Sequence, residues 1–136
     1  MKKELGSCYI TTTDDVDKLE FDWGAIHMLC DERVTGGKSM SFGHVVLELG
    51  KGHIRHNHPD ADEVIYVVSG EADQMLDDKE PVRVKAGDCM WIPKGVYHST
   101  INKGNEPTHL IVVYAPAGAE APLRTAPDVK ITPPRK

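Results

Sequence analysis

Short runs of strand-forming residues, each closed by turn residues, are the feature that most limits how this chain can fold. Runs at 43–49, 63–68 and 109–114 are rich in Val, Ile and Leu, and they end at clusters such as Gly50-Lys51-Gly52 and Ser69-Gly70-Glu71. The chain also contains 12 Gly and 9 Pro, which punctuate it at short intervals. Strands that recur about every ten residues are typical of a β-sandwich or β-barrel. The sequence therefore predicts an all-β protein.

The two ends of the chain differ from its middle. Residues 1–41 are more polar and less regular, and residues 115–136 carry five prolines that would interrupt a strand ladder. We therefore expect one domain over 1–136, with an irregular N-terminal arm and edge strands at 1–41, a barrel core at 42–114 and a Pro-rich tail at 115–136. The tail is expected to wrap over the barrel or a partner chain, or to be mobile. A turn or two between Asp14 and Leu19 is the only helix expected.

Charge and cysteine content exclude several classes of protein. Lys and Arg number 16 against 21 Asp and Glu, for a net charge of −5, which argues against nucleic-acid binding. No apolar run approaches the roughly 20 residues of a membrane span. Three cysteines without a CxxC spacing argue against a disulfide framework, and the first residues lack the apolar stretch of a secretory signal. A cytoplasmic protein is expected.

Two histidines mark a candidate metal site. In His56-Asn57-His58 the imidazoles are two positions apart, so in a strand they share one face about 7 Å apart. Glu63 opens the next predicted strand, and a turn would bring its carboxylate beside the pair. These residues alone fit a metal site and a solvated strand end equally well.

A longer pattern of fixed spacings surrounds this pair. The first part is Gly50, five residues, His56-x-His58, four residues, Glu63, six residues and Gly70. The second is Gly87, five residues, Pro93-x-Gly95, two residues, His98, three residues and Asn102. Both parts resemble the two motifs of the cupin superfamily at every fixed position.

The resemblance implies a fold, a metal and an assembly. The fold is a double-stranded β-helix, or jelly-roll barrel, and the chain is expected to form a homodimer. One divalent transition metal per chain (Fe, Mn, Ni, Co or Zn) would sit inside the barrel on His56, His58, Glu63 and His98, since mixed nitrogen and oxygen ligands suit these ions.

The resemblance also implies a range of functions. The leading hypothesis is a metal-dependent enzyme of the isomerase, lyase, decarboxylase or dioxygenase type that acts on a small polar metabolite with adjacent oxygens. Glu63 and Tyr97 are the candidate proton-transfer residues. With only 2 Trp, 4 Tyr and 2 Phe, an aliphatic or sugar-like substrate is favoured over an aromatic one. The alternative is a module that binds a metal or metabolite without turnover.

The other histidines and one cysteine are expected to have structural roles. His27, His44, His53 and His109 lie outside both motifs and are expected at the surface or an interface. Strand parity places His53 opposite His56, facing away from the interior unless a bulge intervenes. Cys89 is expected to be a small core residue, because no His and acid pattern marks it as a nucleophile.

The glycines of the motifs and the ends of the chain complete the expectations. Gly50, Gly70, Gly87 and Gly95 are expected at tight turns with positive φ. The two ends of the chain have apolar side chains that one small barrel is not expected to bury. This is the reason, besides the family resemblance, for expecting a homodimer that covers exposed sheet edges.

Overall fold

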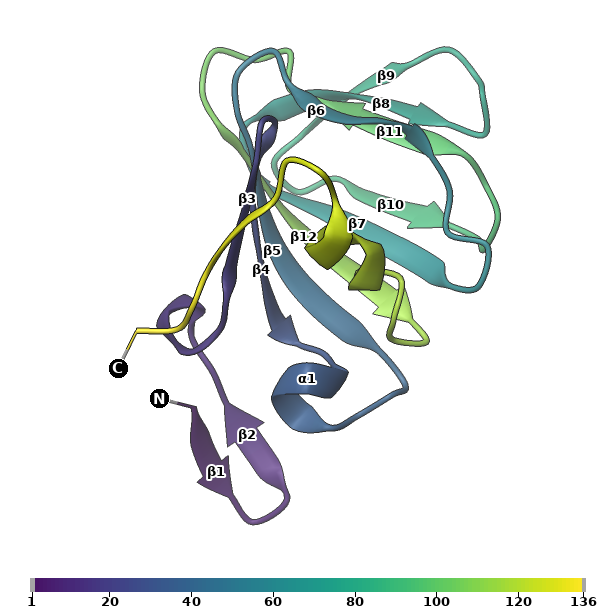
Figure 1. Ribbon diagram of the computed structural model, residues 1–136. Coiled ribbons are helices and arrows are strands. Elements are labelled where there is room, and N and C mark those ends of the chain that lie inside the picture. The colour runs from purple at the N-terminus through teal and green to yellow at the C-terminus, as the bar shows by residue number, and fades with distance from the viewer. Residues whose placement is uncertain (1, 136) are drawn as a thin grey trace.

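The computed structural model describes residues 2–135 and consists of two antiparallel sheets that face each other (Figure 1). The larger sheet holds, in spatial order, β10 (Cys89–Ile92), β7 (Asp62–Ser69), β12 (Thr108–Ala115), β5 (Ser41–Leu47), β4 (Gly24–Cys30), β3 (Lys18–Phe21) and β13 (Lys130–Thr132). The smaller sheet holds β6 (Gly52–His56), β11 (His98–Ile101), β8 (Glu71–Leu76) and β9 (Val82–Lys85). This arrangement confirms the predicted all-β jelly roll.

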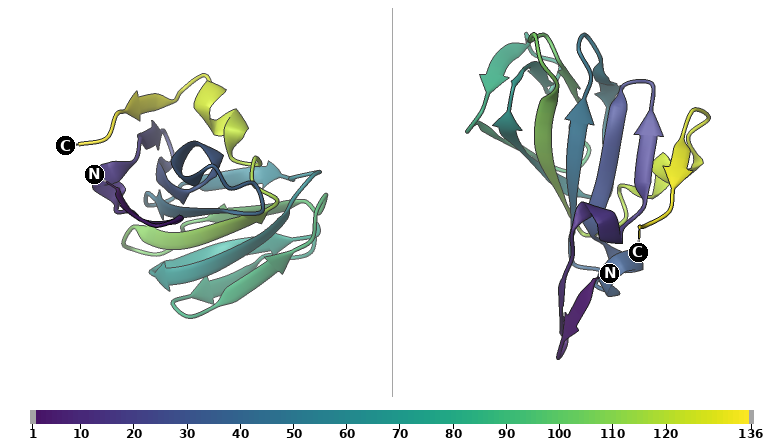
Figure 2. Two further views of the ribbon diagram at one scale, coloured as in Figure 1. Left: turned by 90° about the horizontal axis from the view of Figure 1, so that it is seen from below. Right: turned by 90° about the vertical axis from the view of Figure 1, so that its left-hand side faces the viewer.

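Three short helices and one hairpin complete the chain. The helices are η1 (Thr13–Asp15), α1 (Glu32–Thr35) and η2 (Ala121–Thr125), and the hairpin pairs β1 (Lys3–Leu5) with β2 (Cys8–Ile10). Figure 2 shows that this hairpin projects away from the two sheets, while η2 lies over the side on which they open. None of the helices within residues 2–135 is long and apolar enough to cross a membrane.

The core lies between the sheets because their strands alternate in burial. Along β12, Leu110, Val112 and Tyr114 are buried, while the residues between them are half-buried on the outer face. A period of two places one set of side chains against the opposite sheet. The predicted runs at 43–49, 63–68 and 109–114 correspond to β5, β7 and β12.

The four motif glycines lie at turns between strands, as expected. Gly50, Gly70, Gly87 and Gly95 all have positive φ, at 74°, 85°, 96° and 82°. Gly70 has a second reason to be glycine, because a Cβ there would lie 2.9 Å from the backbone oxygen of Pro107. Both constraints exclude a side chain at the β7–β8 turn.

The prediction of a helix between Asp14 and Leu19 is wrong, apart from a single turn. Only η1 is helical, and β3 begins at Lys18, because Val16 and Leu19 are buried against the larger sheet. Extended pairing with β4 places Leu19 opposite Ile26 in the core. Burial of strand residues thus outweighs the local helix signal.

The tail also differs from expectation, because it contains a strand. β13 pairs with β3 at the sheet edge, with Lys130 opposite Glu20, and prolines flank the strand without interrupting it. The apolar residues of the N-terminal segment, among them Leu19, Ile26 and Met28, are buried within the same chain. The expectation that the ends cannot bury their apolar side chains in one barrel is therefore wrong for these residues, whereas Leu5 and Ile10 of the hairpin are more than half exposed.

Candidate metal centre

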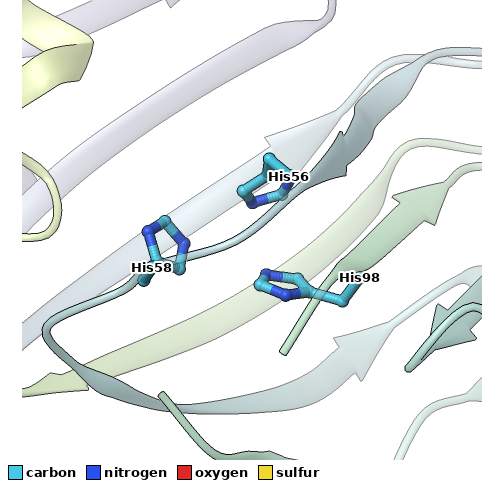
Figure 3. Close-up of side chains that lie close together, drawn as sticks. All are labelled: His56, His58 and His98. Atoms are coloured by element: carbon cyan, nitrogen blue, oxygen red, sulfur yellow. The ribbon is translucent and has the colours of Figure 1, made fainter. Parts of the chain in front are cut away.

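Three imidazoles meet inside the barrel from two strand ends. His56 ends β6, His58 follows it in the loop to β7, and His98 opens β11 directly opposite His56 in the strand register. Their ring nitrogens lie within 4.8 Å of one another, and Figure 3 shows the three rings turned toward a common point. Three neutral imidazoles with this convergence could hold a metal ion.

Local hydrogen bonds fix where the rings point. The turn before His98 is tied to the loop of His58, because the Gly95 backbone N–H donates to the His58 carbonyl at 2.9 Å. The Nδ1 of His56 lies 2.6 Å from the carbonyl of Ile54, and the Nδ1 of His98 lies 3.0 Å from that of Val96. When Nδ1–H donates to a carbonyl, the Nε2 lone pair is left free to bind a metal.

Glu63 approaches this group from the opposite sheet. Its side chain is 3% exposed, and Oε1 lies 2.9 Å from the Nε2 of His98 and 3.3 Å from the Nε2 of His58. Burial raises the pKa of Glu63, but the two imidazoles outweigh it and hold the pKa at about 2. The carboxyl group is therefore ionised at neutral pH.

These contacts leave polar atoms unsatisfied. Within residues 2–135, Oε1 of Glu63 and the Nε2 atoms of His58 and His98 are buried and have no hydrogen-bond partner of acceptable geometry. Buried polar atoms without partners cost free energy, and such groups in native proteins call for an explanation. A cation between the three atoms would satisfy all of them, so the residues present fit a metal.

A small cavity of about 20 Å³ adjoins these groups, with apolar side chains along much of its wall. The lining includes Val45, Ile65 and Leu110, with Tyr114 beside the ligands. Tyr114 is buried, its ring lies edge-on to that of His58 at 4.9 Å, and burial raises its pKa. Sequence reasoning missed this residue, although strand parity with Leu110 and Val112 could have found it.

His53 faces the interior, contrary to the parity argument. His56 pairs with His98 but His53 pairs with Thr100, so one extra residue of β6 bulges out of the ladder. The bulge turns Ile54 to solvent, where it is 79% exposed, and brings the His53 ring to 5.1 Å from that of His56. Burial then lowers the pKa of His53 to about 4.

Arg55 and Tyr97 lie on the outside of the barrel. Arg55 donates to Asp78 at 2.7 Å and stacks over the Tyr97 ring at 3.7 Å. Tyr97 is 38% exposed and is absent from the cavity lining. A proton-transfer role for Tyr97 remains a prediction.

Gln74, Asn102 and Cys89 lie outside the set of candidate ligands. Gln74 is buried and accepts a hydrogen bond from the Thr100 hydroxyl at 2.6 Å. Asn102 donates to the carbonyls of Leu47 and Glu106, and so ties two loops together. Cys89 is exposed, so its expected place in the core is wrong, and its neighbours in β10, Met90 and Ile92, face inward instead.

The chain is similar to known proteins in sequence and in fold. A family model described as "Cupin domain" matches residues 43–114. The chain is 26% identical to the tetracenomycin polyketide synthase protein TcmJ of Streptomyces glaucescens over 68% of its own length and 62% of the relative's. The chain therefore spans less than two thirds of this curated relative.

Solved structures give the same picture of the fold. An RmlC-like cupin from Shewanella frigidimarina superposes with a TM-score of 0.68 at 20% identity, over 85% of this chain and 94% of the other. A formate complex of oxalate decarboxylase from Lactobacillus farciminis gives a TM-score of 0.69 at 25% identity, over 84% of this chain and 36% of the other.

Proposed function

The chain belongs to the cupin family, and from this premise we propose that it is a metal-dependent enzyme acting on a small molecule with adjacent oxygens. The observation that carries the proposal is the set of three buried, unpartnered atoms contributed by His58, Glu63 and His98. The packing of a β-barrel does not require such a set. When no metal is bound, apolar side chains at these positions would make the protein more stable than buried polar ones.

His56, His58, His98 and Glu63 would hold one divalent ion, with Fe, Mn, Ni, Co and Zn as the candidates. When bound, the ion supplies Lewis-acid polarisation of a substrate oxygen. The ionised Glu63 carboxylate would accept a proton at an oxygen that does not hold the ion. The apolar side chains that line the adjoining cavity would limit access of water to that proton.

The substrate class we propose is a hydroxy acid, a keto acid or a sugar derivative, and the reaction is of the isomerase, lyase, decarboxylase or dioxygenase type. The Lactobacillus farciminis relative supports an acid, since it is an oxalate decarboxylase solved with formate. Tyr97 is kept as a second proton-transfer candidate, to be compared with Tyr114 by Tyr→Phe substitution at each position. Loss of turnover on replacing Tyr114 alone would remove Tyr97 from the proposal.

The test is metal content per chain by mass spectrometry, on protein purified without a chelator or affinity column. We expect about one transition metal per chain, lost in a His56→Ala, His98→Ala double variant. A His109→Ala variant is the matched control, because His109 lies on the outer face of the larger sheet. No metal in the wild type, and none after reconstitution, would overturn the proposal.

A non-catalytic binding module is the second candidate. It is favoured by the small size of the cavity at the ligands, about 20 Å³, which is far below the volume of ordinary small-molecule sites. If the metal-loaded protein binds a hydroxy acid but does not convert it within hours, the result would favour the non-catalytic binding module.

We also propose that two copies pair through the outer face of the larger sheet, where Tyr66 and Trp91 are exposed.

We propose the cytoplasm, a reducing compartment, as the location of the protein, because the thiols of Cys8 and Cys89 are free and exposed.

A further inference from the structure

A cleft of about 610 Å³ opens to solvent beside the candidate metal centre. Its lining includes His53 and His56, and both of these residues also line the small cavity at the ligands. The cleft and the centre therefore adjoin each other across these two imidazoles. Its volume is within the range of small-molecule sites.

Large apolar side chains make up much of the wall of this cleft. Trp23, Ile54, Ile101 and Leu123 line it, and the charged side chains Lys51, Asp22 and Asp128 complete the lining. Ile54 is placed here by the β6 bulge, which leaves it 79% exposed within the cleft. A large aliphatic side chain turned outward beside a polar centre indicates a surface that an apolar group covers.

Trp23 is held in a fixed orientation at the inner end. Its ring stacks on Phe21 with centroids 4.6 Å apart and planes 7° from parallel. Its other neighbour is His53, whose ring lies 4.2 Å away at nearly a right angle. Aromatic residues are few in this chain, yet Trp23 lines this wall with Phe21 stacked on it, and a rigid aromatic surface suits a flat apolar ligand.

The walls also come from parts of the chain that the family match leaves out. Trp23 precedes residues 43–114 and Leu123 follows them, whereas all the candidate ligands lie within that range. The centre is thus built from the shared barrel, and the cleft is completed by the chain's own ends.

A second opening, of about 360 Å³, leads to His58 and has a different character. It is lined by Asn57 and Asp60 together with small and proline residues, such as Ala61 and Pro116. It offers no large aliphatic or aromatic wall, so an apolar group would gain less there.

We propose that the first cleft binds the apolar, ring-sized side chain of a hydroxy or keto acid whose oxygens reach the metal centre. This inference rests on the proposed function and narrows it, since a sugar would leave the Trp23, Ile54 and Leu123 wall uncovered. It also reverses the preference for a sugar-like substrate that the low aromatic content suggested.

The test compares 3-phenyllactate with lactate, two acids with the same hydroxy acid group. Calorimetric titration of the metal-loaded protein should show 3-phenyllactate binding about tenfold more tightly or better, because a phenyl group is removed from water. An Ile54→Asp variant should lose most of that preference, measured as the ratio of the two affinities within the variant. Equal affinities, or a preference that survives in Ile54→Asp, would overturn the proposal.

Val82→Asp is the matched control. Val82 is 63% exposed on β9, at the opposite edge of the same sheet, and should keep the full preference. A preference lost equally in both variants would contradict a role of the cleft.

Nuclear magnetic resonance separates the cleft from the metal. In metal-free protein, millimolar 3-phenyllactate should shift the indole N–H signal of Trp23 and leave that of Trp91 in place, with a Trp91→Phe variant for assignment. If the protein binds no metal but Trp23 shifts, the proposed function fails and the cleft stands. If metal binds but Trp23 does not shift and lactate binds as well as 3-phenyllactate, the cleft fails and the metal centre stands.

Discussion

At the scale of single residues, the charge of Glu63 determines how well the centre suits a cation. The carboxylate lies between two imidazoles in an interior that excludes water, where an opposite charge acts strongly. It is the only acidic member of the proposed ligand set, so it supplies all of the charge that the protein offers to the ion.

Glu63→Gln tests this role with little change in shape. We expect metal affinity to fall at least about tenfold, because a neutral amide oxygen replaces a carboxylate ligand. Competition with a chromophoric chelator gives the affinity. Glu80→Gln, at an exposed position, should bind as the wild type does, and unchanged affinity in Glu63→Gln would remove the carboxylate from the ligand set.

The sequence allowed the triad of imidazoles to be predicted because spacing in a strand and a motif fixes their faces. His53 could not be placed in the same way, since parity fails wherever a bulge adds a residue. Tyr97 adjoins His98 in the chain and still lies outside, whereas Tyr114 reaches the cavity from a strand of the other sheet. Proximity in sequence is therefore a poor guide to the wall of the site.

A histidine pair on the outer face gives a pH prediction. The Nε2 of His44 lies 3.0 Å from the Nδ1 of His109, and His27 is opposite His44 on β4. Burial, and then the neighbouring His109, lower the pKa of His44 below its usual value. Burial also lowers the pKa of His27, where the charges of His44 and Lys18 act in the same direction and Asp14 and Glu20 oppose them.

His27 and His44 therefore bind fewer protons in the folded chain than in the unfolded chain just below pH 6.5, and their contribution to the free energy of unfolding should fall as the pH drops through that value. Urea denaturation at pH 7.5, 6.5 and 5.5 measures the slope. His44→Gln should reduce it, and His109→Gln should reduce it less. An unaltered slope in His44→Gln would show that the pair is not linked to folding.

At the scale of elements, the pairing of β6 with β11 carries the centre. Both strands contribute a histidine at the same register position, and Gly52 sits at the other end of that pairing, opposite Ile101. A Cβ at Gly52 would lie 2.0 Å from the Thr100 backbone oxygen, a distance that the strands could relieve only by moving apart.

Gly52→Ala should therefore lower the free energy of unfolding by about 2–3 kcal/mol, as overpacking does in well-packed interiors. Metal affinity should fall as well, because β6 carries His53 and His56. Denaturant titration and metal competition measure the two effects. Gly104→Ala is the control, since its nearest neighbours would be at 3.5 Å or more, and a Gly52→Ala protein as stable as this control would contradict the argument.

The elements were predictable where burial follows a local pattern. β5, β7 and β12 alternate regularly, and their runs are visible in the sequence. β13 was missed because its partner lies far away in the chain: Ile131 pairs with Leu19 of β3. Local propensity gives no signal of such a pairing.

At the scale of the whole molecule, the outer faces of the two sheets differ in chemistry. The smaller sheet is charged, and Arg83 pairs there with Asp73 at 2.7 Å and lies 3.9 Å from Glu71. The larger sheet presents Trp91, 59% exposed, and Tyr66, 44% exposed, with half-buried aliphatic residues between strands. Only the second face resembles the apolar centre of a protein interface.

Because Leu19, Ile26 and Met28 of the N-terminal segment are buried within their own chain, we propose that the homodimer rests on this face and not on exchanged arms. A two-fold axis through it would bring each Trp91 against the other copy and cover Tyr66. Light scattering after size exclusion should give twice the chain mass of 15.0 kDa for the wild type and a single chain mass for a Trp91→Asp, Tyr66→Lys double variant. Val82→Asp, on the smaller sheet, should remain a dimer. A monomeric wild type would overturn the homodimer, and a dimer that persists in the double variant would place the interface on another face.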